Sequence, residues 1–495
     1  MGLNGAMKKL DQLNFQNTFA RLPGTFHSRL HPTPMPEPYL VSFNANAAEL
    51  IDLDADEAMR ADFAEYFIGN RLLPGSDPLA MLYAGHQFGH FVPQLGDGRA
   101  ILLGEVKNRA GEHWDLQLKG AGATPFSRSG DGRAVLRSSI REYLCSEAMH
   151  GLGIPTTRAL CIVGSDEEVW RETVESAAVV TRIAPSHVRF GSFEVFFYRD
   201  QPEAISLLAD YVIARHFPEL ADAPGKYPRF LNEVVTRTAR LMAKWQAVGF
   251  SHGVMNTDNM SILGLTFDYG PFGFMETYNP GYVCNHSDHG RRYAFDRQPQ
   301  IGLWNLTCLA QALTPIVPVE EARAVLSRYG PTYAEHYVDL MSQKLGLTRA
   351  GKEDVALIEA LLGLMHANQV DYTNMFRSLG HFKSAPGEQN SVVRDQFIDR
   401  SAFDAWAENY RARLQNEAGT DEERKVRMDR VNPKYILRNY LAQVAIGKAE
   451  KERDFSEVDR LLKLLGRPFD EQPEMADYAA PPPDWAQHIA VSCSS

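Results

Sequence analysis

The pattern of hydrophobic and polar positions divides the chain into a strand-rich first part and a helical second part. Residues 85–106 hold two apolar runs separated by Asp97-Gly98, which predicts a β-hairpin with its turn at that dipeptide. Residues 113–119 ("HWDLQLK") alternate between apolar and polar side chains, so this predicted strand faces the core on one side and carries Lys119 on the other. Residues 178–184 predict a further strand.

Helical spacing appears within the first part and dominates the second. Residues 137–155 predict a helix that stops at Gly151, and residues 231–250 predict one that Gly249 can cap. The uncharged stretch 301–319 resembles a membrane span, but its asparagine, glutamine and two prolines favour a buried helix ending near residue 315. Residues 260–267 predict a short hairpin or a bent strand, and helix follows helix from about residue 320.

This order of elements predicts an α+β fold in two lobes with a cleft between them. We expect a sheet-rich N-terminal lobe in residues 1–177, including an extended N-terminal arm that is rich in proline. A mainly helical C-terminal lobe is expected in residues 178–475. Residues 476–495 are expected to be a flexible tail, which carries Cys493.

Composition and charge narrow the range of partners. Of the 495 residues, 44% are hydrophobic and 23% are charged, which is typical of a globular protein with a large core. A net charge of -11 argues against binding to nucleic acid or to an anionic membrane surface. The N-terminal segment lacks the apolar core of a signal peptide, and the five cysteines show no paired spacing. We therefore expect a cytoplasmic protein, and we expect it to be a monomer.

The segment "SHGVMNTDNMSILGLTFDYG" (251–270) is the strongest candidate for chemistry. Asn259 and Asp268 offer an amide oxygen and a carboxylate, which are hard ligands suited to Mg²⁺ or Mn²⁺, although both residue types also serve ordinary turns. Val254 stands where a kinase of the "HGD" type carries its catalytic aspartate. Asp258 is the nearest carboxylate that could accept a proton from a hydroxyl, and an Asx-turn is its structural alternative.

Cationic side chains elsewhere could bind phosphate. Lys119 on a strand and Glu142 on the next helix fit the ion pair that places an ammonium on phosphate oxygens in kinases. Glu142 also fits a capping box that begins at Ser139, and Glu147 is a second candidate for the pairing. Arg182 and Arg189 flank a proline-containing turn and could bind one phosphate together, or they could be ordinary surface arginines. Two glycine-rich tips could also approach phosphate with their backbone amides, or they could be plain turns. The tips contain Gly96, Gly98 and Arg99, and Asp131, Gly132 and Arg133.

A histidine-rich segment, "CNHSDHGRRY" (284–293), contains residue types that bind zinc. His286, Asp288 and His289 lie too close together in sequence for a usual zinc site, so we do not expect a metal there. Cys493, three residues from the end, is either a chance cysteine of the tail or an exposed and oxidisable thiol.

Taken together, these motifs resemble the selenoprotein O family (SelO/YdiU) over nearly the whole chain. The resemblance is carried by "AGHQFGHFVPQLGDGRAILLGEV", "LQLKGAGATPFSRSGDGRAVLRSSIREYL", "TRIAPSHVRFGSFE", the 251–270 segment with its continuation "PFGFM", "YNPGYVCNHSDHGRRYAFDRQP" and the terminal "CSS". It implies a protein-kinase-like fold that binds ATP in reversed orientation, with the γ-phosphate buried, and that transfers AMP to Ser, Thr or Tyr hydroxyls of proteins.

The resemblance also implies roles for individual residues. Asn259 and Asp268 would hold the metal, Asp258 would be the base, Glu142 would pair with Lys119, and Cys284 could form a redox pair with Cys493. The nucleotide would contact Gly96, Gly98, Arg99, Lys119, Asp131, Gly132, Arg182, Arg189 and Asp268.

The implied activity leaves variants open. ATP would be the substrate with Mg²⁺ or Mn²⁺, and UMP transfer from UTP is a variant within the family. The alternatives are a kinase that uses Asp258 as its base and a nucleotide-binding pseudokinase that acts as a scaffold without turnover.

Overall fold

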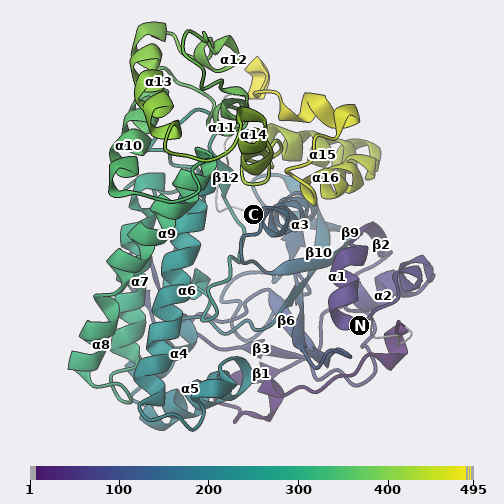
Figure 1. Cartoon of the computed structure of the whole chain (residues 1–495). Coiled ribbons are helices and arrows are strands. Elements are labelled where there is room, and N and C mark those ends of the chain that lie inside the picture. Colours follow the sequence, from purple (N-terminus) through teal and green to yellow (C-terminus); the bar gives the residue numbers. More distant parts are fainter. Residues whose placement is uncertain (1–6, 487–488, 490, 492–495) are drawn as a thin grey trace.

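The computed structural model describes residues 7–486, 489 and 491, and begins with a large antiparallel sheet. Eight strands form this sheet in the order β1-β3-β6-β7-β10-β9-β2, with β8 paired to β10. Figure 1 shows it in the first part of the chain, against which the helices of the second part gather. The strands are β1 (His27–Arg29), β2 (Tyr39–Phe43), β3 (Leu79–Met81), β6 (Ala100–Lys107), β7 (His113–Lys119), β8 (Ala134–Val135), β9 (Arg158–Trp170) and β10 (Val174–Ala184).

Helices cover both faces of the sheet. Short helices of the N-terminal arm pack on one face, where Leu116 and Leu118 of β7 are fully buried. Helix α3 (Leu136–Gly151) packs on β9 and β10 and joins the sheet to the helical part. The helices of the arm are α1 (Ala45–Ala48) and α2 (Phe63–Ile68).

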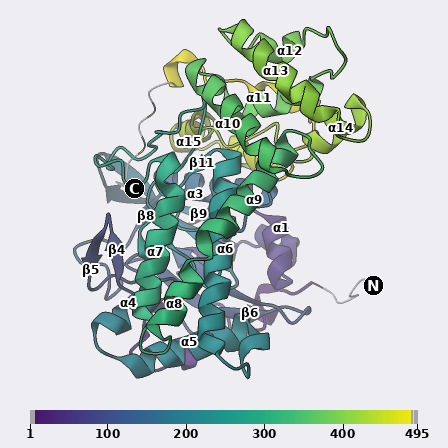
Figure 2. The same cartoon turned by 60° about the vertical axis from the view of Figure 1, so that its left-hand side comes forward.

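The helical part is arranged around α6 (Lys226–Val248), which contacts α7, α8 and α9 (Figures 1 and 2). Gly249 ends α6 with φ +75°, a left-handed conformation that glycine adopts without steric cost. The other helices are α4 (Gly191–Tyr198), α5 (Pro202–His216), α7 (Gln298–Ala312), α8 (Val319–Leu326), α9 (Tyr329–Lys344), α10 (Lys352–Ala367), α11 (Tyr372–Ser378), α12 (Ser391–Arg394), α13 (Arg400–Leu414), α14 (Asp421–Asp429), α15 (Asn439–Glu452) and α16 (Ser456–Leu465).

The predicted hairpin turn at Asp97-Gly98 is wrong. The hairpin in this region joins β4 (Gly85–Gln87) to β5 (His90–Val92) through Phe88-Gly89, whose positive φ values of +50° and +86° suit a two-residue turn. Asp97 is instead buried, and its carboxylate accepts hydrogen bonds from the Met81 amide (3.1 Å) and the Gln117 side chain (3.2 Å). These long-range partners hold residues 93–99 as a loop at the edge of the sheet.

The expectation for residues 260–267 is also wrong, because this segment forms neither a hairpin nor a continuous strand. It makes isolated bridges to two distant parts of the chain, Ser261 to Arg189 and Thr266 to Thr156. A short pair, β11 (Phe250–Ser251) with β12 (Gly273–Phe274), closes the segment on its outer side. Residues 251–270 are therefore held as a loop by several elements at once.

The mixed class, with a sheet followed by helices, is confirmed, whereas the kinase-like two-lobed arrangement and the three boundaries remain predictions. Strand β10 runs through residue 177, so the sheet continues to Ala184.

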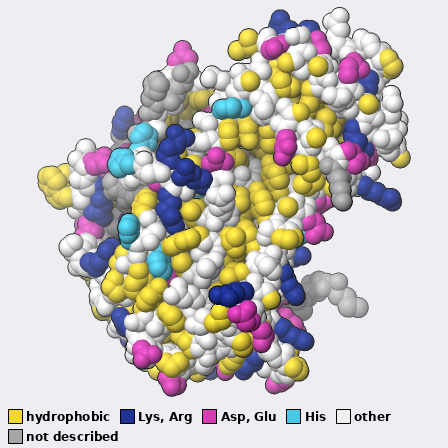
Figure 3. All heavy atoms as spheres, turned by 90° about the vertical axis from the view of Figure 1, so that its left-hand side faces the viewer, with side chains coloured by type: hydrophobic (Ala, Val, Ile, Leu, Met, Phe, Trp, Pro, Cys, Tyr) yellow, Lys and Arg dark blue, Asp and Glu magenta, His cyan; other side chains and the backbone are white. Residues whose placement is uncertain are grey.

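Among the described residues no helix is long and apolar enough to cross a membrane, and α7 ends three residues before Pro315, as predicted. On the face in Figure 3, acidic and basic side chains are interspersed beside a band of hydrophobic ones.

Candidate active site

A cleft of about 800 Å³ lies between the sheet and the loop at 254–271. Every residue predicted to bind nucleotide or metal, or to act as base, lines it. The predicted residues in its wall are Gly96, Gly98, Arg99, Lys119, Asp131, Gly132, Arg182, Arg189, Asp258, Asn259 and Asp268. Residues from five separate stretches of sequence thus meet in one cavity.

A charge cluster forms one end of this cleft. Glu142 of α3 contacts Lys119 Nζ at 2.5 Å and accepts a hydrogen bond from Arg182 Nε. Asp268 accepts hydrogen bonds from Arg182 Nη2 at 2.6 Å and from Arg189 Nη1 at 2.7 Å, and Lys119 lies 4.0 Å from it. Arg189 also lies 4.0 Å from the buried Asp97. Three cations and three carboxylates thus form one buried network, whose guanidinium and ammonium groups are suited to bind phosphate.

The alternatives for Glu142 are resolved by the start of α3. The helix begins at Leu136 after Val135, so Glu142 lies in its second turn and cannot complete a capping box with Ser139. Glu147 bonds Arg158 (2.8 Å) and the Ala159 amide (2.9 Å), away from Lys119. The pairing of Lys119 with Glu142 is therefore the one that the structure shows.

Attraction between the cations and the carboxylates of the cluster shifts the pKa values of its acidic groups against the effect of burial. Burial by itself would raise the pKa of Asp268, but Arg182, Arg189 and Lys119 together hold that pKa well below its usual range. Glu142 is held below its usual pKa in the same way by Arg182 and Lys119. Burial and the neighbouring Arg182 lower the pKa of Lys119 to about 8, although Glu142 opposes this shift.

Two glycines in the wall of the cleft are required by close packing on neighbouring parts of the chain. A Cβ on Gly96, whose φ is +124°, would lie 2.5 Å from the Phe126 ring. A Cβ on Gly132, whose φ is +72°, would lie 2.1 Å from the Gly122 carbonyl carbon. The neighbouring Asp131 carboxylate pairs with Arg171 at 2.8 Å, which fixes the 130–133 loop on the β9–β10 hairpin.

Asp258 lies next to the charge cluster on a short 3₁₀ turn (Thr257–Asn259), and its backbone carbonyl accepts a hydrogen bond from Arg189 Nη1 at 2.7 Å. Its Oδ2 accepts a hydrogen bond from Gln87 Nε2 at 3.2 Å, and its Oδ1 is buried without a hydrogen-bond partner among the described residues. Burial raises the pKa of Asp258 to about 7, against the smaller opposite effects of Gln87 and Arg189. A carboxylate with this pKa is suited to accept a proton near neutral pH.

The segment at β4 braces this loop, and sequence reasoning missed it. The His86 amide donates to Thr257 Oγ1 at 2.7 Å, beside the bond from Gln87 to Asp258. Gly85 has no Cβ, and one placed there would lie 2.5 Å from Asp258 Oδ1. The polar sequence "GHQ" within a predicted strand could have indicated that these side chains have polar partners elsewhere in the chain.

Asn259 and Asp268 fit a hard divalent cation by their chemistry. The Asn259 Nδ2 donates to the Val254 carbonyl at 3.0 Å, and this bond leaves the amide oxygen for a ligand role. Asp268 has φ +59°, an unusual backbone conformation for a residue other than glycine. Asp288 instead accepts bonds from the backbone amides of Arg292 (2.9 Å) and Tyr293 (2.7 Å), so its carboxylate stabilises a turn.

Cys284 is buried, and its Sγ lies 3.4 Å from Ser251 Oγ. Burial raises the pKa of its thiol to about 12, so the reactive thiolate is disfavoured. The backbone of Val491 accepts a hydrogen bond from the His286 amide at 3.0 Å, two residues from Cys284. Cys493, the predicted redox partner, lies outside the described residues.

Comparison with known proteins identifies the family. The family model "Protein adenylyltransferase SelO" matches residues 9–466. Proteins named protein nucleotidyltransferase YdiU are 62% identical in Thiobacillus denitrificans, 60% in Myxococcus xanthus and 59% in Thioalkalivibrio sulfidiphilus. Each match covers 99% of this chain and 100% of the relative. The chain therefore belongs to the SelO family of protein nucleotidyltransferases.

Proposed function

We propose that this protein transfers AMP from ATP to Ser, Thr or Tyr hydroxyls of other proteins and of itself, and releases pyrophosphate. In this proposal the fold is kinase-like and two-lobed, and ATP binds with its terminal phosphates at the charge cluster. The observation that carries the proposal is the position of Lys119, Arg182 and Arg189. The two arginine side chains are nearly fully buried, and their guanidiniums suit the terminal phosphates of a bound nucleotide.

The reversed nucleotide explains why Val254 can replace the usual kinase aspartate. With the β- and γ-phosphates at the buried cations, the α-phosphorus faces the side of the cleft where Asp258 lies. The acceptor hydroxyl gives its proton to Asp258, and its oxygen forms a bond to the α-phosphorus while the bond to the β-phosphate oxygen breaks. Lys119, Arg182 and Arg189 stabilise the negative charge that develops on the leaving pyrophosphate.

Asn259 and Asp268 are the residues that would hold Mg²⁺ or Mn²⁺ in this proposal. A bound cation would supply further charge neutralisation for the phosphates. Both Asp268 oxygens now accept hydrogen bonds from arginines, and phosphate oxygens can replace the carboxylate at those guanidiniums. Nucleotide and metal binding should therefore depend on each other.

UMP transfer from UTP is a second candidate within the same chemistry. The relatives carry the broader name nucleotidyltransferase, which does not specify the base. The charge cluster would hold the triphosphate of either nucleotide, because its contacts are to phosphate alone. Competition between ATP and UTP in one reaction measures the preference.

Two substitutions test the proposed roles. Asp268→Ala should abolish both transfer and metal-dependent ATP binding, because it removes a metal ligand and unbalances the buried cations. Asp258→Asn should keep ATP binding and slow transfer by about 10²–10⁴-fold, the usual contribution of a general base. Isothermal titration and single-turnover transfer separate these effects. Full activity of Asp258→Asn would show that the base is assigned wrongly.

A further inference from the structure

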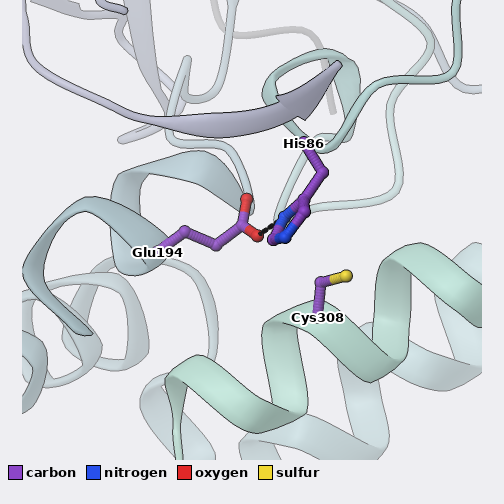
Figure 4. Close-up of side chains that lie close together, drawn as sticks. All are labelled: His86, Glu194 and Cys308. Atoms are coloured by element: carbon purple, nitrogen blue, oxygen red, sulfur yellow. Dashed lines mark hydrogen bonds and ion pairs between the residues drawn. The ribbon is translucent and has the colours of Figure 1, made fainter. Parts of the chain in front are cut away.

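Three side chains with metal-binding groups converge behind the loop that carries Asp258, and the proposed function uses none of them. They are His86 of β4, Glu194 of α4 and Cys308 of α7. Figure 4 shows the Glu194 and His86 side chains pointing toward each other, with the Cys308 side chain rising beside them from another helix. One ligand atom from each residue lies within 4.8 Å of the other two.

The carboxylate at the centre of this cluster is fixed on both sides. The Glu194 side chain is fully buried, and its Oε1 lies 2.5 Å from His86 Nδ1 (Figure 4). Its Oε2 accepts a hydrogen bond from the Thr257 hydroxyl. Hydrogen bonds to both oxygens fix the carboxylate and the imidazole relative to each other, as the partners around a metal site do.

The thiol of Cys308 is the second observation. Cys308 is only 9% exposed, and its Sγ lies within 4.8 Å of ligand atoms of both other residues. The hydrogen bond between His86 and Glu194 accounts for those two side chains without a metal. It gives no reason for a thiol close to both of them.

We propose that His86, Glu194 and Cys308 form a binding site for a thiophilic divalent cation, with Zn²⁺ as its best match. Imidazole nitrogen, thiolate sulfur and carboxylate oxygen are the ligands that Zn²⁺ takes, and three protein ligands leave a fourth tetrahedral position for water. Binding releases the thiol proton of Cys308 and the proton between His86 and Glu194 to solvent. The His86 side chain, 12% exposed, provides the route of entry.

This site differs in chemistry from the one at Asn259 and Asp268. Oxygen ligands favour Mg²⁺ or Mn²⁺, whereas a thiolate favours zinc-type ions. A cation at the His86 site would tie β4, α4 and α7 together and hold Thr257 through Glu194. The proposal is independent of which nucleotide is transferred, and its test does not use activity.

Cobalt(II) binding to the metal-free full-length chain tests the site, because a thiolate bound to Co²⁺ gives an intense near-ultraviolet absorption that oxygen ligands do not give. We expect this absorption to saturate at a single equivalent and to disappear when Zn²⁺ is added. It should be lost in Cys308→Ser and weakened at least tenfold in affinity in His86→Gln, the usual cost of a lost ligand or its support.

Two controls make the result specific. Cys145→Ser removes another buried thiol, and Cys493→Ser removes the thiol of the tail; both should retain the absorption. Circular dichroism establishes that each variant is folded. The proposal would be overturned if the folded wild type showed no such absorption. It would also be overturned if Cys308→Ser kept the absorption, or if only Cys493→Ser lost it.

Discussion

Asp258 illustrates how much a single residue's chemistry depends on its surroundings. Its identity as the nearest carboxylate to Val254 could be read from the sequence, but its environment could not. Burial raises its pKa to about 7, and the bond from Gln87 partly offsets this shift. Gln87 lies 171 residues earlier in the chain, so no local pattern indicates the contact.

The activity should therefore have a bell-shaped pH dependence. Asp258 accepts a proton only when ionised, so kcat/KM should rise as the pH increases through about 7. Lys119 binds phosphate only when protonated, so kcat/KM should fall as the pH increases beyond about 8. Measuring kcat/KM for ATP between pH 5 and 10 checks both limbs.

Gln87 provides a matched test of the acid limb. Gln87→Leu removes a hydrogen bond that lowers the pKa of Asp258, so the rising limb should move to higher pH. Gln94→Leu changes an exposed glutamine outside this cleft, which bonds Arg199, and should leave the profile unchanged. An acid limb at the same pH in wild type and Gln87→Leu would contradict the role of this contact.

At the scale of elements, α3 carries two buried glutamates with separate tasks. Glu142 faces the cleft and pairs with Lys119 and Arg182, whereas Glu147 pairs with Arg158. Sequence alone left both as candidates for Lys119, because it does not show which face of α3 meets the strand. The ion pairs of the two carboxylates decide between them.

Substituting these two glutamates should separate stability from activity. Glu147→Gln breaks a buried ion pair and should lower the free energy of unfolding by about 3–5 kcal/mol, with normal transfer at temperatures where the variant is folded. Glu142→Gln should reduce transfer at least tenfold under the same conditions, because Lys119 loses its orienting partner. Chemical denaturation and transfer assays on both variants provide the comparison. Equal activity of the two variants would contradict the division of roles.

Elements with local signals were predicted well, and those fixed by distant contacts were not. The end of α3 at Gly151 and the end of α6 before Gly249 were predicted correctly, although the left-handed glycine that follows α3 is Gly153 (φ +70°) and not Gly151. Asp97-Gly98 carries an equally strong local signal, but Met81 and Gln117 hold Asp97 in a buried loop. Long-range hydrogen bonds thus override turn propensity at the edge of the cleft.

At the scale of the whole molecule, the loop at 251–270 is surrounded by segments that are far from it in sequence. Gln87 and His86 brace it, and the backbone at Val491 bonds His286, two residues after Cys284. Cys284 in turn contacts Ser251 at the start of the loop. No sequence pattern specifies it, because it depends on the packing of the sheet against the helices.

A disulfide between Cys284 and Cys493 would make activity depend on redox conditions. Cys284 is buried and its pKa is about 12, so it should oxidise slowly unless its surroundings open. Wild-type transfer should change when an oxidised sample is reduced, whereas Cys493→Ser should be insensitive. Non-reducing mass spectrometry identifies the bridge. Identical behaviour of both proteins under oxidising and reducing conditions would count against a regulatory bridge.

Parallel labelling with ATP radiolabelled at the α- or the γ-phosphate measures the orientation of ATP in the cleft directly. The protein should be incubated with Mg²⁺ or Mn²⁺, alone and with a cell lysate, and label should be followed into protein. Terminal phosphates held by Arg182 and Arg189, as proposed above, predict transfer of the α-label only. Transfer of the γ-label would contradict reversed binding and make the protein a kinase, and ATP binding without transfer of either label would indicate a scaffold.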